Sequence, residues 1–389
     1  MKNHTQLARL SLLSILSLAT ILAFTTNSSA TGNIVKSDLA GTWQFALRGT
    51  TGCGNSAMQA TMTMNTAGVG TGTLVTHGQC GDSTLTGQTF TIKTLAINGS
   101  GSAGLTCGVG CGWTFKIQVS PDRSKINLVD VAAINPLNYV EGIAILASPA
   151  GDIVKSDLTG SWQMTFFGQT GCGIGATLVT FTLNSAGVAT NATETGHNAG
   201  CPDGTSSNNN FTIQSLNADG SGVAGLTCGT GCGWTLNIQV SPDRSTFSIV
   251  DVASINPLNF VAGVAVNNST AAKVSIANLL GKWQLALYGQ TGCGIGSSLV
   301  TFSLNAAGVA TNASNTAHNA GCGDTVSTGN SFTILSLNAN GSGTAGLTCG
   351  TGCGWTFNIQ VSPDRSTFNV VDVFAANPNN FLVGTAIHE

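Results

Sequence analysis

The chain has 389 residues, of which 42% are hydrophobic and only 7% are charged, and its formal net charge is −3. A typical soluble domain has about 25% charged residues, and binding to nucleic acid or to an anionic membrane requires clustered Lys and Arg. The composition therefore argues against both as partners. The hydrophobic content is sufficient for a folded core, so we expect the 51 glycines in tight turns rather than in disordered chain.

The first 30 residues are typical of a secretory signal peptide. Lys2 and Arg9 precede an apolar run from Leu10 to Phe24, and the small residues Ser28-Ser29-Ala30 follow this run. The apolar run is too short for a membrane-spanning helix, although an uncleaved membrane anchor is the competing interpretation. We expect a secreted, cell-surface or periplasmic protein with no membrane span. Without this segment the chain has 11 basic and 16 acidic residues, a net charge of −5.

Three copies of one stretch follow, over residues 34–146, 153–266 and 274–388. A period of about 115 residues is a complete domain rather than a solenoid unit of about 20–50 residues. The joints between the copies are short and contain small, polar residues and one proline. The sequence therefore predicts three tandem domains, and such short joints favour contact between neighbours.

Each copy alternates apolar and polar residues with a period of two, as in Trp283, Leu285 and Leu287. Turn sequences such as Asn98-Gly99 separate these runs at hairpin spacing. Copy one has eight such runs, near residues 41–49, 57–65, 70–77, 88–97, 102–107, 111–119, 125–133 and 138–146. We predict an all-β chain of three eight-stranded antiparallel up-and-down barrels, since closure removes exposed strand edges. A flat or two-layer sheet is the alternative.

The start of each copy carries a resemblance to known families. Leu39-Ala40-Gly41-Thr42-Trp43 resembles the Leu-x-Gly-x-Trp start of lipocalins and of the avidin family, and the other copies repeat the pattern up to Trp162 and Trp283. The resemblance implies an eight-stranded meander barrel with one end open for ligand entry. The biotin-pocket pattern of avidins is not recognisable, so biotin binding does not carry over.

The twelve cysteines divide into four per copy, and an even number in an exported chain indicates disulfides. In a meander they all fall in connections at one end of the barrel, which the resemblance identifies as the open end. Four cysteines allow three pairings; we favour first with second and third with fourth, so that the last pair closes a small glycine-containing loop. The cysteines are Cys53, Cys80, Cys107 and Cys111, then Cys172, Cys201, Cys228 and Cys232, then Cys293, Cys322, Cys349 and Cys353.

Other polar residues recur in equivalent places of the three copies. A histidine precedes the second cysteine and an aspartate follows it, so a zinc site is the alternative to disulfides if the thiols are reduced. The competing interpretation of the histidine is a rim residue that hydrogen-bonds the loop. An aspartate in the seventh strand could bind a ligand in the cavity, be turned outward by a bulge, or pair with Arg123, Arg244 or Arg365. These residues are His77, His197 and His318; Asp82, Asp203 and Asp324; and Asp130, Asp251 and Asp372.

No catalytic arrangement recurs in the three copies. Histidine is too rare for a Ser-His-Asp set in each, and no paired glutamates recur as in glycosidases. We therefore predict no catalytic residue, metal or cofactor, and a non-enzymatic secreted protein that acts as an extracellular or cell-surface binding module. Its ligand would be a glycan, a small molecule or like subunits. The alternatives are a structural subunit or rod of an extracellular assembly, and a carrier that holds a small apolar ligand in each barrel.

Overall fold

The computed structural model describes residues 32–131, 136–227, 233–254, 257–268, 273–349, 354–373 and 380–389. The expected signal peptide lies outside these residues, as do Cys228, Cys232 and Cys353. Among the residues that are described, no helix combines the length and hydropathy needed to cross a membrane.

The protein consists of three closed antiparallel barrels of eight strands each, which confirms the predicted fold class and excludes the flat-sheet alternative. Barrel 1 comprises β1 (Gly41–Thr51), β2 (Gly54–Met64), β3 (Val69–Gly78), β4 (Ser83–Leu95), β5 (Ser100–Thr106), β6 (Gly112–Val119), β7 (Lys125–Asp130) and β8 (Tyr139–Leu146). Barrel 2 comprises β9 (Gly160–Thr170), β10 (Gly173–Leu183), β11 (Val188–Asn198), β12 (Gly204–Leu216), β13 (Ser221–Thr227), β14 (Gly233–Val240), β15 (Thr246–Ser254) and β16 (Phe260–Asn268). Barrel 3 comprises β17 (Gly281–Thr291), β18 (Gly294–Leu304), β19 (Val309–Asn319), β20 (Gly323–Leu337), β21 (Ser342–Thr348), β22 (Gly354–Val361), β23 (Thr367–Val371) and β24 (Phe381–His388).

The Leu-x-Gly-x-Trp segment closes one end of each barrel. In barrel 1 a short 3₁₀ helix, η1 (Lys36–Leu39), precedes the first strand, and the indole Nε1 of Trp43 donates to the Leu39 carbonyl at 2.9 Å. Gly41 lies between them with φ +145°, a conformation that only glycine adopts readily. Equivalent helices η2 (Lys155–Leu158) and η4 (Ile276–Leu279) precede barrels 2 and 3. The tryptophan is therefore a core residue that attaches the entering chain to the closed end.

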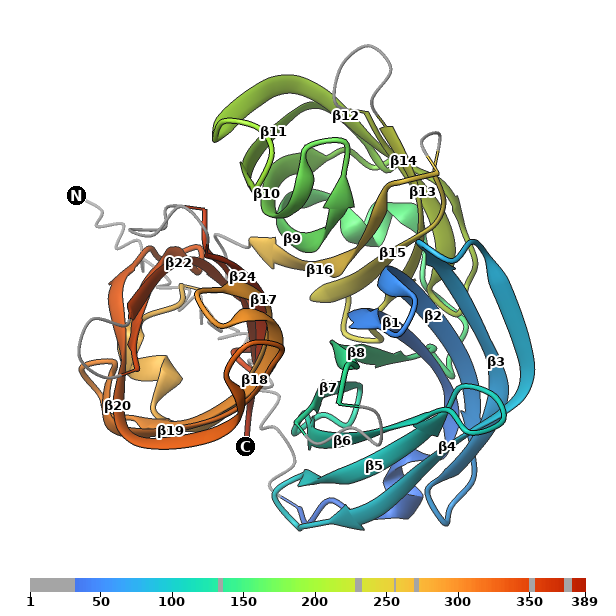
Figure 1. Cartoon of the computed structure of the whole chain (residues 1–389). Helices are drawn as coiled ribbons and strands as arrows, with labels where there is room; N and C mark the ends of the chain where they lie inside the picture. Colours follow the sequence, from blue (N-terminus) through green and yellow to red (C-terminus); the bar gives the residue numbers. More distant parts are fainter. Residues whose placement is uncertain are drawn as a thin grey trace, which may run out of the picture.

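The three barrels form a ring around a common centre (Figure 1). The first two strands of each barrel pack against the last two strands of another: β1 and β2 against β15 and β16, β9 and β10 against β23 and β24, and β17 and β18 against β7 and β8. One head-to-tail contact is thus used three times and closes on itself, as in a cyclic trimer. The chain is a closed ring of barrels rather than a rod.

The seams between the barrels contain apolar clusters and a few buried hydrogen bonds. Ile143 and Ile145 of barrel 1 pack against Val264 and Val266 of barrel 2. A buried asparagine at one position of the seventh strand crosses two of the seams. Asn369 donates to carbonyls of barrel 2, and Asn127 donates to carbonyls of barrel 3. Since these groups are buried, the pairing also fixes the register of one barrel on the next.

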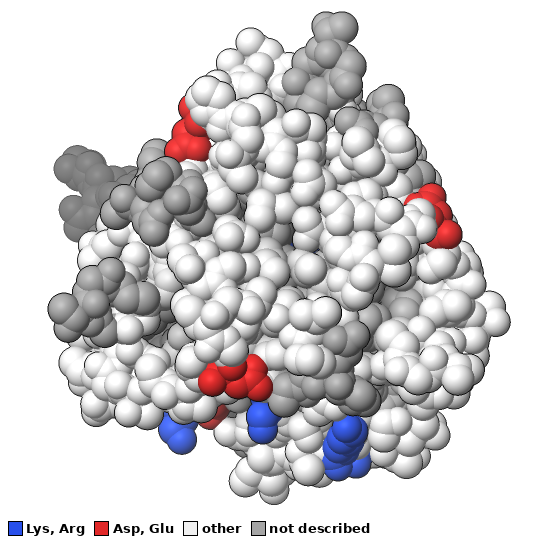
Figure 2. Space-filling model, in the orientation of Figure 1, with Lys and Arg blue, Asp and Glu red and all other residues white. Residues whose placement is uncertain are grey.

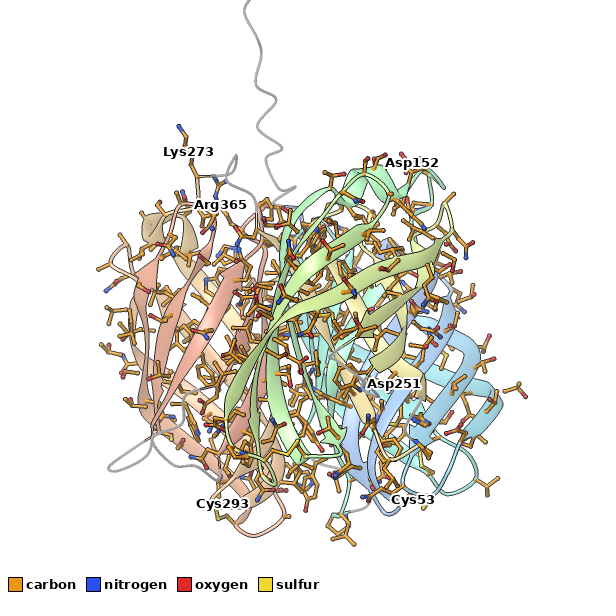
Figure 3. All side chains as sticks on the ribbon, turned by 90° about the horizontal axis from the view of Figure 1, so that it is seen from above. Cys53, Asp152, Asp251, Lys273, Cys293 and Arg365 are labelled. Atoms are coloured by element: carbon orange, nitrogen blue, oxygen red, sulfur yellow. A yellow bond between two sulfur atoms is a disulfide. The ribbon has the colours of Figure 1, made fainter. Side chains whose placement is uncertain are left out.

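All barrels point the same way. Figure 3 shows Cys53 of barrel 1 and Cys293 of barrel 3 at one end of the molecule, and Asp152, Lys273 and Arg365 at the opposite end. The ring therefore has a disulfide face and, on its other side, a face formed by the closed barrel ends.

Candidate functional site

The disulfides connect the loops at the disulfide face. Cys53, after β1, pairs with Cys80, after β3, with Cα atoms 5.4 Å apart, and Cys107 pairs with Cys111 across the β5–β6 connection. Barrels 2 and 3 repeat the first pairing as Cys172–Cys201 and Cys293–Cys322, and Cys349 is also disulfide-bonded. These pairs follow the favoured connectivity. No described cysteine is free, so the thiolates that a zinc site would need are not available.

Each rim histidine lies at a seam rather than in a barrel mouth. His197 Nδ1 is 2.6 Å from an oxygen of Asp203, and its ring packs 4.5 Å from that of Phe381 in barrel 3. The same arrangement recurs around the ring: His77 pairs with Asp82 and packs on Phe260, while His318 pairs with Asp324 and packs on Tyr139. Each histidine thus links its own rim loop to the next barrel. In these positions the rings are buried and support the disulfide face from below.

The aspartates of the seventh strands lie inside the barrels. Asp130 is fully buried and shares the inner face of β7 with Ile126 and Leu128 of the core. Asp251 and Asp372 are equally buried, on the same faces as the core residues of β15 and β23. Two of the arginines considered as partners bind other carboxylates at the closed ends: Arg123 binds Asp38, and Arg244 binds Asp152 and Asp157.

The mouth of barrel 1 is a cavity of about 410 Å³ that opens between its two disulfides. Met58, Leu74 and Trp113 line its inner walls. The Trp113 side chain is only 4% exposed, and its Nε1–H has no acceptor among the described residues. A buried donor in an apolar cavity is the kind of group that orients a small ligand.

The three barrels differ chemically at one position of this region. Leu74 of barrel 1 lies opposite Ala60 in the β2–β3 register, Glu194 of barrel 2 lies opposite Val179, and Asn315 of barrel 3 lies opposite Val300. Burial raises the pKa of the Glu194 carboxyl to about 7, and no charged neighbour contributes to that shift. A carboxyl that titrates near neutral pH inside a barrel is a candidate binding group.

Sequence reasoning did not identify Glu194. Copy two has one residue more than copy one between the start of the third strand and its histidine, and the extra residue forms bulges on both sides of Ala192 in β11. Counting from the strand start therefore aligns Thr193, not Glu194, with Leu74. Counting backwards from the histidines would have aligned the correct pair.

At the opposite face, three equivalent turns meet at the ring centre. Carboxylate oxygens of Asp122, Asp243 and Asp364 lie within 4.8 Å of one another. The ammonium of Lys125 is fully buried, 2.9 Å from Asp243, 3.5 Å from Asp122 and 3.7 Å from Asp364. Burial opposes the charge on Lys125, but the carboxylates hold its pKa above the ordinary value. Burial raises the pKa of the Asp243 carboxyl, but the charge of Lys125 and the hydrogen bonds to this carboxyl together lower it by more. The pKa of that carboxyl therefore lies well below its ordinary value.

The sequence reveals these aspartates only as turn residues, a role that they also have. Asp122 accepts a hydrogen bond from the Ser124 amide at 3.2 Å within its own turn. The convergence of three turns more than 100 residues apart depends on the ring, which the sequence does not specify. The cluster is structural: it joins the three barrels at the end remote from the cavity.

Comparisons with known proteins assign no family. No family model matches the chain, and no curated protein matches it. Among solved structures, transferrin-binding protein B of Neisseria meningitidis serogroup B is similar at a TM-score of 0.29 and 10% identity, over 85% of this chain and 66% of that one. A transferrin-binding protein B variant from Haemophilus parasuis gives 0.30 and 8%, over 89% and 74%. Kievitone hydratase from Nectria haematococca gives 0.22 and 9%, over 61% and 91%. Likenesses this distant carry no information on function.

Proposed function

We propose that the protein is a non-enzymatic, extracellular or cell-surface binding module that takes small ligands into its barrel mouths. The observation that carries this proposal is the cavity of about 410 Å³ at the mouth of barrel 1, with apolar walls and the unpaired indole donor of Trp113. Its volume is in the range of small-molecule sites, which combine an apolar lining with a few polar groups. The cavity opens at the mouth and extends to residues of the lumen wall, a shape that favours a small molecule over a glycan chain or a second protein.

The disulfides and the signal-like start of the sequence support an extracellular location. Disulfides persist in oxidising compartments, and the bridges of the disulfide face hold the loops around each mouth. The low charge of the surface also fits. Figure 2 shows one face of the molecule on which Lys, Arg, Asp and Glu are few and scattered, so long-range electrostatic attraction contributes little to capture.

The ring makes the mouths a set of three. Because the barrels point the same way, their mouths share one face at fixed spacing, and a target that displays several ligands could engage more than one mouth. The chain would then act as a rigid trivalent binder without assembling into an oligomer.

The experiment is a titration of the exported protein with the neutral dye Nile red, monitored by dye fluorescence. The test variant is Leu74→Trp, which fills the barrel 1 cavity. The control is Thr71→Trp on the same strand, where the side chain is exposed on the outer face. We expect saturable binding to the wild type, loss of one binding site in Leu74→Trp and an unchanged titration in Thr71→Trp. No saturable binding to the wild type, or equal loss in both variants, would refute the proposal.

A further inference from the structure

Glu194 points into the lumen of barrel 2, close to its mouth. Its Cα is paired with that of Val179, which is paired in turn with Met164, and both partners belong to the barrel core. Directly opposite residues of neighbouring strands share one face of the sheet, so Glu194 projects inward from the same row. Its Oε2 atom is buried and has no hydrogen-bond donor among the described residues.

Two aromatic rings lie one row nearer the mouth. Phe166 is paired with Thr177, the inward residue next to Val179 on β10. Its ring meets that of Trp234 edge to face, with centroids 5.7 Å apart. Trp234 is only 6% exposed, and its Nε1–H lacks an acceptor among the residues that the structure describes. The barrel thus holds an unpaired acceptor and an unpaired donor with aromatic surface beside them.

The equivalence of the barrels places these groups around one space. Leu74 and Trp113, the counterparts of Glu194 and Trp234, line the same cavity in barrel 1. The strands of barrel 2 follow the same order and direction. By analogy with barrel 1, we place Glu194 of β11 and Trp234 of β14 at the same mouth.

We infer that the mouth of barrel 2 binds a small aromatic or apolar amine that also carries a hydrogen-bond acceptor, with Glu194 as its counter-ion. A ligand ammonium supplies the positively charged partner that the buried Glu194 carboxylate lacks. The rings of Phe166 and Trp234 favour a cation at their faces, and the ligand's acceptor pairs with the Trp234 N–H. This inference rests on the proposed function and assigns the ligand class to one of the three mouths.

The selectivity for barrel 2 follows from Glu194 alone. Asp251 is the other carboxyl on the inner face of this barrel, but Asp130 and Asp372 occupy the same place in the other two. An amine site that depended on Asp251 would recur in all three barrels. Leu74 and Asn315 offer no charge at the position of Glu194, so one amine site per chain is expected.

The test is isothermal titration calorimetry of the whole chain with three related probes. Phenylethanolamine has the ring, the ammonium and a hydroxyl acceptor. In α-ethylbenzyl alcohol a methyl group replaces the ammonium, and phenethylamine lacks the hydroxyl. We expect phenylethanolamine to bind tightest, with one site per chain, and the alcohol to bind at least about tenfold more weakly, as for the loss of a charged hydrogen bond.

Protonation provides a second readout that a structural role of Glu194 would not produce. The free carboxyl has a pKa of about 7, and a bound ammonium lowers it. Binding near pH 7 should therefore release protons, seen as a dependence of the heat on the ionisation enthalpy of the buffer. At about pH 8 most of the carboxyl is already ionised while the probe amine is still mostly protonated, so the release should be much smaller.

Variants assign the effect to residues. Glu194→Gln keeps the shape of the side chain and should remove both the proton release and the preference for the amine over the alcohol. Trp234→Phe should remove the preference for phenylethanolamine over phenethylamine. Asn315→Leu is the matched control in barrel 3 and should change neither.

The outcomes separate this inference from the proposed function. If the amines bind no better than the alcohol, or if Glu194→Gln leaves amine binding and proton release unchanged, the amine site is refuted. Should none of the probes bind while Nile red still occupies barrel 1, the amine site fails and the binding-module proposal stands. Should neither bind, both are wrong.

Discussion

Replacement of Lys125 by threonine tests how the ring is held together. Threonine is the natural residue at the equivalent positions, Thr246 and Thr367, and both are fully buried. The change therefore introduces a side chain that the same turn already accommodates in two barrels. What it removes is an ammonium that lies within 4 Å of three carboxylates.

The expected cost is large because the carboxylates remain behind. Their side chains are 26–31% exposed, so the remaining charges are only partly solvated. At 4.8 Å two unit charges repel by about 3–4 kcal/mol at an effective dielectric constant of about 20. Removing one partner from a buried ionic cluster typically costs about 3–5 kcal/mol. We expect Lys125→Thr to destabilise the folded chain by about that amount at neutral pH.

The assay is guanidinium and thermal denaturation of the disulfide-bonded chain, followed by circular dichroism at several pH values. Lys116→Thr is the control, because it removes the same charge from an exposed site on β6 of the same barrel. That change should fall within about 0.5 kcal/mol of the wild type.

The pH dependence should also change sign. In the wild type the pKa of Asp243 is depressed. The stabilisation that ionised Asp243 provides is therefore complete above its pKa in the unfolded state, and it is lost as the pH falls through its pKa in the folded state. In Lys125→Thr mutual repulsion raises the carboxyl pKa values, so acidification from neutral pH first stabilises the variant. A Lys125→Thr protein as stable as the control, or one whose stability only declines on acidification, would refute this account of the ring centre.

Three further predictions concern the lumen, the rim and a seam. The folded-state pKa of Glu194 is raised from 4.5 to about 7, so the folded state binds the proton more tightly and stability should fall as the pH rises through that window. Glu194→Gln should remove about 3 kcal/mol of this dependence, as measured by denaturation midpoints at both ends of the window; an unchanged pH profile would contradict it. Replacing Cys53 and Cys80 together by serine should lower the free energy of unfolding by about 2–4 kcal/mol and weaken Nile red binding to barrel 1. Unchanged stability and unchanged dye binding would show that this bridge does not hold the mouth. Asn369→Ser removes the amide that donates to the Gln163 and Val264 carbonyls. It should lower the free energy of unfolding, measured by thermal denaturation, by about 1–3 kcal/mol; a midpoint equal to that of the wild type would show that this pairing does not stabilise the seam.

The fold within one repeat could be predicted because its signals are local. Period-two alternation, hairpin turns and the spacing of the cysteines are properties of short segments, and a meander joins such segments in sequence order. The eight strands, their closure and the cysteine pairs of the described residues follow from these signals.

The site could be predicted only in part, because its residues depend on how barrels meet. The position of His197 at a seam requires Phe381 of another barrel, and the sequence contains no signal for that contact. Seam residues such as Ile143 and Val264 have the same alternating pattern as strand residues that face solvent or core. Glu194 was missed for a different reason: a bulge shifted the register by one residue, and a shift of one residue moves a side chain to the other face.

A single chain can make the ring asymmetric where a trimer of identical subunits could not. Three identical subunits would bring either no lysine or three lysines to the axis, and neither number suits three carboxylates that meet there. The fused chain has one Lys125 and two threonines, so one ammonium bridges all three turns while two neutral side chains fill the space beside it. The same freedom applies to the lumens, where leucine, glutamate and asparagine occupy equivalent positions. Because the seams hold the barrels in fixed positions, each mouth can change its lining independently of the others.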